Sequence, residues 1–273
     1  MTDGVAGTPV ITRAAAILRA LADARSDGLT TTELARTTDM PRATAHRMLT
    51  ALAGEGLVDR ASDTGLWFLG PEVYLLGSVA AARYDAAPLA TDILRALTRD
   101  TGESAFLSAR RGDESVCVSA EEGSFPLRSH VLYPGKRFPL GVASAGIVML
   151  AHLPDSEIAA YLDRVDLTAD WGAVHSPAQL RRRIEQTRIS GYSVNPGLIV
   201  EGSWGIGAAV FNELGQPMWA LSLTGVEMRF DARRQAALGE SLLLAAHALS
   251  QRLKRKRLSG GGRAARDADA GGR

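Results

Sequence analysis

The chain has 273 residues, of which 46% are hydrophobic and 22% charged, and its 31 basic residues are balanced by 30 acidic ones. This composition is typical of a globular protein with room for two domains, and it excludes a chain that binds nucleic acid as a broad polycation. A single cysteine, Cys117, excludes an internal disulfide and a cysteine-rich zinc site. Because no signal-peptide pattern and no long apolar run are present, we expect a cytoplasmic protein without a membrane span.

A first domain is predicted over residues 9–70, after a disordered N-terminus at residues 1–8. Apolar residues at helical spacing predict a helix over 10–24, and Thr30 with Glu33 forms a capping box that begins a second, short helix. A turn over 37–40 leads to Pro41, which fits the first turn of a third helix ending at Gly54 or Gly56. Two strands at 57–60 and 66–69 follow. This order indicates a winged helix-turn-helix, whose second motif helix enters the major groove of DNA.

The third helix has one face for packing and one for contact with a partner. At about 100° per residue, Ala45, Met48, Leu49 and Leu52 collect on the packing side. Arginine can bind phosphate or guanine, and small residues let the backbone approach a groove, so the other side suits DNA. An ordinary solvated face is the alternative for this helix taken alone. The predicted DNA-contacting residues are Arg42, Ala43, Thr44, His46, Arg47 and Thr50.

The segments TTTELARTTDMPRATAHRMLTALAGEGLVDR and LWFLGPEVYLLG resemble the DNA-binding domain of the isocitrate-lyase-regulator (IclR) family of bacterial transcription factors. Later segments resemble the effector domain of that family, so the resemblance covers about residues 9–252. It implies a transcriptional regulator, with repression as the default sign. One such helix reads only a half-site, so we expect a homo-oligomer, a dimer or a dimer of dimers, on a palindromic operator.

A linker helix is predicted over 71–86, with an apolar stripe of Val73, Leu76, Val79 and Ala80 that should pack on the winged domain or its symmetry mate. Pro88 is expected to end or kink it before a helix over 89–101. Hairpins at 105–119 and 205–226, helices at 143–151, 155–162 and 177–189, and a last helix over 231–254 follow. They predict an α+β domain over 87–254, one antiparallel sheet with helices on its faces; the resemblance implies a GAF-like α/β effector-binding domain. Residues 255–273, basic and glycine-rich, should be disordered.

A helix that begins at Ser144 and Ala145 offers N–H groups and a hydroxyl to an anionic or polar ligand. The resemblance implies an effector site made by this helix start, the loop before the last hairpin and the inner face of that hairpin. Plain strand alternation is the alternative for the last two residues of the set. The candidate effector residues are Ser144, Ala145, Asn195, Ser203, Trp204, Gly205, Ser222 and Thr224.

Where the family commonly has an acidic residue, a cysteine and a lysine, this chain has Asn195, Gly205 and Ile147. We therefore expect a site that has lost charge, has open space at Gly205 and has an aromatic wall from Trp204. Such a site favours an aromatic or acyl effector over a small, highly charged keto acid. Arg128 could bind a carboxylate, although an exposed strand would explain it equally.

No cofactor or metal is expected, because the five histidines lack ligand spacing and the glycines at 202–207 lack the strand-to-helix setting of a dinucleotide site. Ser144 in LGVASAG is similar to a nucleophile elbow, but Val142 replaces the first glycine and no triad partners accompany it. We therefore expect no enzyme. The alternative is a small-molecule sensor or serine hydrolase-like enzyme whose helix-turn-helix binds protein, and salt-dependent DNA binding would distinguish the two.

Overall fold

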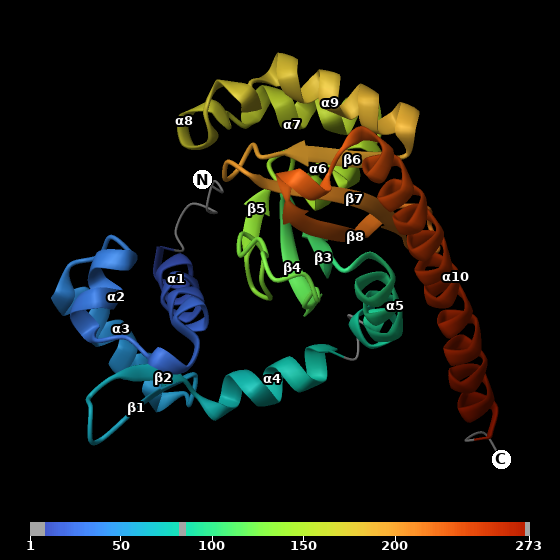
Figure 1. Cartoon of the computed structure of the whole chain (residues 1–273). Helices are drawn as coiled ribbons and strands as arrows, with labels where there is room; N and C mark the ends of the chain where they lie inside the picture. Colours follow the sequence, from blue (N-terminus) through green and yellow to red (C-terminus); the bar gives the residue numbers. More distant parts are fainter. Residues whose placement is uncertain (1–8, 82–85, 271–273) are drawn as a thin grey trace. The chain divides into compact units, whose positions relative to one another are not determined.

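A computed structural model describes the backbone of residues 9–81 and 86–270, and the side chains within these ranges except those of Arg25, Ala81 and residues 256–270. The chain divides between Tyr84 and Asp85 into two compact units, each of which is described by itself (Figure 1). The predicted disordered N-terminus at residues 1–8 lies outside the described residues.

The first unit is a winged helix-turn-helix, as predicted. The capping box before α2 is present: Glu33 N–H donates to Thr30 Oγ1, and Thr30 N–H donates to the Glu33 carboxylate over 2.8 Å. Ile17, Leu49 and Trp67 belong to one buried cluster that joins the helices to the wing. The elements are α1 (Pro9–Ala24), α2 (Thr31–Thr37), α3 (Arg42–Gly54), β1 (Val58–Arg60), β2 (Trp67–Leu69) and α4 (Pro71–Ala81).

The turn between α2 and α3 depends on a left-handed residue. Asp39 has a φ of 49°, a conformation that aspartate tolerates better than most residues, and Met40 N–H donates to the Ala35 carbonyl over 2.9 Å. Pro41 is the N-cap of α3 rather than a residue of its first turn, so the helix begins at Arg42, one residue later than predicted. Its carbonyl accepts from the N–H groups of Thr44 and Ala45, so proline still begins the helix.

One expectation for the segment after the wing is wrong, and another is answered only in part. Pro88 does not end a helix; it lies in the first turn of α5 (Ala86–Thr101), where its missing N–H would have had no helical partner. The α4 stripe was expected to pack on the winged domain or its symmetry mate. The winged domain of the same chain does not cover Leu76, 56% exposed, or Val79, 76% exposed, so packing on a second copy stays a prediction. Short α4 has no described neighbour that covers these side chains.

The second unit holds a six-stranded antiparallel sheet, as the α+β prediction requires. Its strand order is β5-β4-β3-β8-β7-β6, so the two long hairpins meet through β3 and β8 at its centre. Both hairpins were predicted, but the two short edge strands β5 and β6 were not. The strands are β3 (Ser104–Arg111), β4 (Glu114–Glu121), β5 (Arg137–Pro139), β6 (Tyr192–Pro196), β7 (Ser203–Phe211) and β8 (Pro217–Val226).

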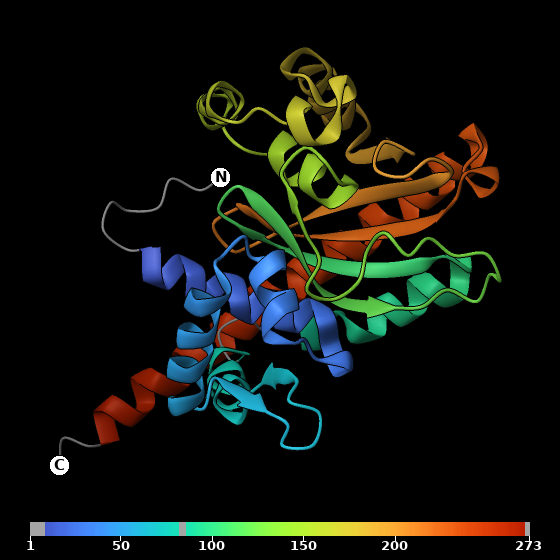
Figure 2. The ribbon, with the colours of Figure 1, turned by 90° about the vertical axis from the view of Figure 1, so that its left-hand side faces the viewer.

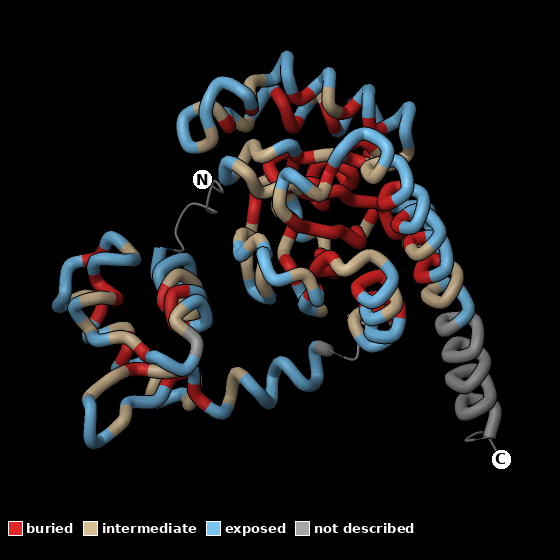
Figure 3. The backbone as a smooth tube through the Cα atoms, viewed as in Figure 1, coloured by how far each residue is buried: buried red, intermediate tan, exposed pale blue. Residues whose placement is uncertain are grey.

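Helices cover both faces of this sheet (Figures 1 and 2). On one face lie α5 and α10 (Ala232–Ala270), and the other face carries α6 (Ser144–Ala151), α7 (Asp155–Arg164), α8 (Thr168–Trp171) and α9 (Pro177–Ser190). Figure 3 shows the buried residues concentrated in the strands and in α6. The α10 backbone continues past the predicted end at 254, and the predicted disorder of residues 255–273, whose side chains beyond Arg255 are not described, stays a prediction.

Candidate DNA-binding helix and effector site

Helix α3 presents the predicted polar face to the outside. Ala45, Leu49 and Leu52 are buried in the core of the first unit. The opposite side is accessible because these buried residues repeat at three- and four-residue intervals and leave one stripe outside. Arg42, Ala43, His46, Arg47 and Thr50 are exposed, and Thr44 is half-buried.

The cationic side chains of this face have no internal partner. Within the described part of the chain, neither Arg42 nor Arg47 makes an ion pair or hydrogen bond through its guanidinium. By contrast, Arg60 on the wing donates to the Gly65 carbonyl over 3.1 Å and lies over the Trp67 ring. The two α3 guanidiniums are therefore free for an external anion, whereas Arg60 stiffens the wing.

In the second unit, the amino end of α6 rests directly on the sheet. A Cβ atom on Gly205 would lie 3.1 Å from Ser144 Oγ, and one on Gly207 would lie 3.0 Å from the carbonyl carbon and oxygen of Ser144. These two glycines of β7 therefore allow the close approach. The expectation of open space at Gly205 is wrong, because Ser144 occupies it.

A cavity lies beside this helix start. It has a volume of about 30 Å³, room for a water molecule or two. The first N–H groups of α6 have no helical acceptor, and the N-cap Ala143 has no side chain that could accept from them. None of the described residues that line the cavity has a charged side chain. The site therefore offers hydrogen-bond donors and the positive end of a helix dipole, without a formal charge.

Seven of the eight predicted effector residues line this cavity, and Ser222 does not. Thr224 lines it, and the buried Thr224 hydroxyl has no hydrogen-bond partner among the described residues; the residue is 9% exposed. Ser222, fully buried, has an unpartnered hydroxyl as well, but it lies beneath α6. Among the lining residues, Thr224 therefore offers a hydroxyl without a described partner, and Ser144 offers another.

Trp204 does not form the aromatic wall that was expected. Successive residues of a strand point to opposite faces, and Gly205 faces α6. The Trp204 ring accordingly packs in the cluster on the α5 and α10 face, 6.3 Å from the ring of Phe230. Trp204 thus reaches the cavity through its backbone and contacts the far side of the sheet through its ring.

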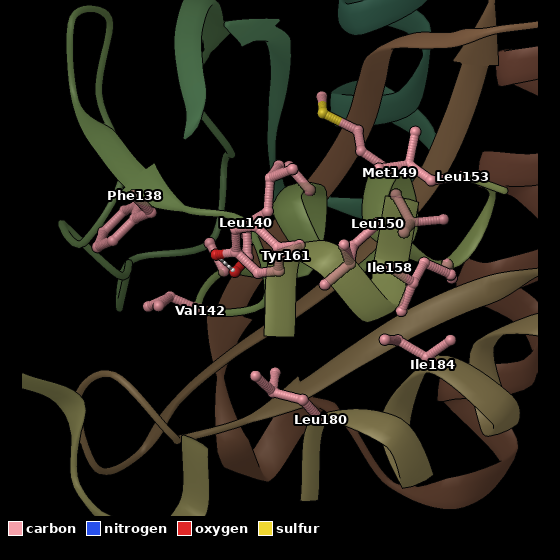
Figure 4. Close-up of a cluster of buried hydrophobic side chains, with 14 of the residues drawn as sticks. Phe138, Leu140, Val142, Met149, Leu150, Leu153, Ile158, Tyr161, Leu180 and Ile184 are labelled. Carbon is pink, nitrogen blue, oxygen red and sulfur yellow. Dashed lines mark hydrogen bonds between the residues drawn. The ribbon is translucent and has the colours of Figure 1, made fainter. Parts of the chain in front are cut away.

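Asn195 lines the cavity but its amide is already used. Its Nδ2 donates to the Val142 carbonyl over 2.7 Å, and its Oδ1 accepts from Leu198 N–H over 3.0 Å. Tyr161 Oη donates to the Leu140 carbonyl, and Figure 4 shows the Tyr161 side chain pointing at Leu140. Asn195 and Tyr161 therefore fix residues 140–142, the segment that leads into the amino end of α6.

Sequence reasoning missed the apolar part of the lining. Val131 and Leu132 come from the loop over residues 122–136, named here the β4–β5 loop, while Phe138 lies on β5 and Ile199 precedes β7. The adjacent apolar residues Val131 and Leu132 in this loop were a signal that could have pointed to it. Arg128, on this loop rather than on a strand, binds Glu122 over 2.7 Å and does not line the cavity.

Neither a metal cluster nor a membrane span emerges from the part of the chain that the structure describes. No group of three histidine, cysteine or acidic side chains is placed to hold a metal ion there. No described helix is both long and apolar enough to cross a bilayer. Burial raises the pKa of Cys117 to about 12, so its thiol stays protonated at neutral pH.

Both units match models of one family. Residues 10–62 match the IclR helix-turn-helix domain, and residues 79–251 match the bacterial transcriptional regulator IclR C-terminal domain. The chain belongs to the IclR family. Members of this family are transcriptional regulators that bind DNA through the helix-turn-helix, which here is the segment α2–α3.

Named relatives of the IclR family agree with this assignment. The chain is 30% identical to the HTH-type transcriptional regulator KipR of Bacillus subtilis over 82% of this chain and 90% of that protein. It is 27% identical to the transcriptional repressor IclR of Escherichia coli over 86% of each. A crystal structure of an IclR homolog from Microbacterium hydrocarbonoxydans, complexed with 4-hydroxybenzoate, shares the fold with a TM-score of 0.72 at 22% identity, covering 89% of this chain and 98% of that one.

Proposed function

We propose that this protein is a repressor that binds a palindromic operator as a homo-oligomer and releases it in response to a small molecule. The observation that carries the DNA-binding part is the exposed face of α3, where Arg42 and Arg47 have no partner among the described residues. Guanidiniums on a groove-sized helix bind phosphates and guanine edges. The named repressors among the relatives support the sign of regulation.

Self-association is supported by the linker helix. On α4, Tyr74, Leu76 and Val79 are 76%, 56% and 76% exposed, and Leu75 beside them is 56% exposed. A contiguous exposed apolar surface of this kind is typical of an interface. A second copy that covers it would place two α3 helices on two half-sites.

The operator can be found without knowing the regulated genes. Selection from a random pool of DNA duplexes with the full-length protein should yield an inverted repeat, because two symmetric recognition helices read two symmetric half-sites. A pool that converges on a single unrepeated motif would contradict binding as a symmetric dimer. Failure to enrich any sequence would contradict operator recognition itself.

The proposed effector is a molecule with a planar acceptor group, such as a carboxylate, on an aromatic or acyl body. The acceptor would take the N–H groups at the amino end of α6 and the Thr224 hydroxyl, and the body would contact Leu132 and Ile199. An aromatic acid is larger than the cavity of about 30 Å³, so its entry requires the β4–β5 loop to move. The 4-hydroxybenzoate complex of the related homolog supports this class.

A thermal-shift screen tests the effector proposal. Aromatic and acyl carboxylates should raise the melting temperature of the wild type, because a ligand that binds only the folded state stabilises it by mass action. Thr224→Val keeps the shape and removes the hydroxyl, so the shift should shrink. A ligand that stabilises Thr224→Val as strongly as the wild type would place the site elsewhere.

A further inference from the structure

Two contacts connect the effector cavity with the segment that precedes α10, which includes the short helix η3 (Glu227–Arg229). The first is the ring contact between Trp204, which lines the cavity, and Phe230, with the two ring planes tilted by 39°. The second comes from the β4–β5 loop: the Arg229 guanidinium lies 4.0 Å from the centre of the Phe125 ring. Arg229 and Phe230 are neighbours in the chain. Trp204 and the β4–β5 loop, which both contribute to the cavity lining, therefore contact the same short segment before α10.

That point holds a buried carboxylate. The Glu103 side chain is 2% exposed and accepts from Arg229 Nε over 2.6 Å and from Arg234 Nη2 over 2.9 Å. Both arginines also donate to the carbonyl of Thr101, the last residue of α5, over 3.2 and 2.8 Å. We name Glu103, Arg229 and Arg234 the arginine clamp. It ties the start of α10 to the carboxyl end of α5.

The clamp is packed too tightly to absorb a displacement locally. A Cβ atom on Gly225 would lie 2.3 Å from Glu103 Oε2 and 2.7 Å from the Phe230 ring. Gly225 pairs with Trp204 across β7 and β8. Because close-packed groups and buried ion pairs move between discrete arrangements, a shift of Trp204 or Phe125 must move the clamp as a unit.

Helix α5 is also held near its other end by α10, which lies beside it on the same face of the sheet (Figures 1 and 2). Arg252 binds the Asp92 carboxylate with both terminal nitrogens, over 2.6 and 2.8 Å, and donates to the Leu89 carbonyl over 2.9 Å. Bidentate pairs of this kind fix orientation as well as distance. In the chain, α5 is the first helix after the segment that leads from the DNA-binding unit.

We propose that Arg229 is a positioning residue that couples occupancy of the effector cavity to the placement of α5. This inference rests on the proposed effector function and names its route of regulation. Arg229 does not line the cavity. It contacts Phe125 on one side and Glu103 and Thr101 on the other, and it acts through these contacts. A ligand that moves the β4–β5 loop or β7 thereby moves α5, the first helix of the second unit.

Hydrogen–deuterium exchange of the full-length chain, without ligand or DNA, tests the coupling. Trp204→Leu perturbs the cavity side of the route, and the readout is the exchange rate of amides in the last two turns of α5. We expect this substitution to speed that exchange at least about fivefold in the wild-type background and less than about twofold in Arg229→Lys, which keeps the charge but loses the planar stack and fork. Arg110→Lys, whose ion pair with Glu157 lies on the α7 side, is the matched control and should retain the wild-type response.

The same fold-change in all three backgrounds, or no effect of Trp204→Leu on α5 in the wild type, would overturn the proposal. A purely structural Arg229 would lower protection of the domain without removing its dependence on residue 204. If Trp204→Leu lowers protection throughout the domain, Phe125→Leu supplies the perturbation from the half-buried loop side. Because neither DNA nor a ligand is used, the coupling can fail while operator and effector binding hold, and the reverse.

Discussion

Replacing Gly207 by alanine tests whether α6 begins against the sheet and forms the edge of the effector site. The new Cβ would lie 3.0 Å from the carbonyl carbon and oxygen of Ser144 and 3.0 Å from Ser193 Oγ, well inside ordinary contact. Neither neighbour can turn away easily, because Ser193 Oγ donates to the same Ser144 carbonyl over 2.7 Å. Overpacking of this kind costs about 1–3 kcal/mol, so the free energy of unfolding of the effector domain should fall by that amount.

Urea denaturation followed by tryptophan fluorescence measures this loss, and Gly205→Ala is the matched control. Its Cβ would meet Ser144 Oγ at 3.1 Å, the end of a side chain that can rotate, so its cost should stay below about 1 kcal/mol. Equal losses for the two variants, or none for Gly207→Ala, would refute the reasoning, since α6 would then not rest on backbone contacts at Gly207.

Thr224→Val should weaken effector binding by about 0.5–1.5 kcal/mol in calorimetry. Ser222→Ala should leave the free energy of unfolding unchanged or raised, because it removes a buried hydroxyl without a partner. Effector binding that weakens in Ser222→Ala and not in Thr224→Val would exchange their roles. Leu76→Asp should shift the oligomer toward monomer in sedimentation velocity by placing a charge on the exposed α4 surface, and an unchanged oligomer would remove α4 from the interface. Burial, with Arg183 adding to it, lowers the pKa of His175 below 6.5, so the unfolded chain binds the proton more readily and stability should fall as pH drops below about 6.5. His175→Gln should remove that fall in urea titrations, and exposed His247→Gln should not.

The local signals in the first unit were strong enough to predict its fold. The capping box at Thr30 and Glu33 and the proline before α3 each set a helix start by short-range geometry, and the structure contains both. The two hairpins of the effector domain were equally local, since their turns carry Gly112 and Gly215 at positive φ. The edge strands β5 and β6 were missed because they are short and each ends in proline, so tertiary pairing rather than propensity forms them.

The effector site was harder to predict because its lining comes from distant segments. The β4–β5 loop and Ile199 reach the cavity only through the folded sheet, and no periodic pattern marks them. Trp204 was misplaced for a simpler reason: the strand was predicted to begin at Gly205, and it begins at Ser203. With the correct start, alternation alone puts the ring on the opposite face from Gly205.

The salt dependence of operator binding tests the central claim most directly. With a duplex from the selection experiment, the logarithm of the wild-type affinity should fall steeply with the logarithm of salt concentration, by about 0.9 for each phosphate that the protein neutralises. Arg47→Ala should make this slope shallower and weaken all sequences alike, Arg42→Ala should relax base preference, and the double variant should lose the operator while remaining folded, because neither side chain has a described partner. A folded double variant that binds the operator with unchanged affinity and slope would contradict the assignment of α3 as the DNA-reading helix.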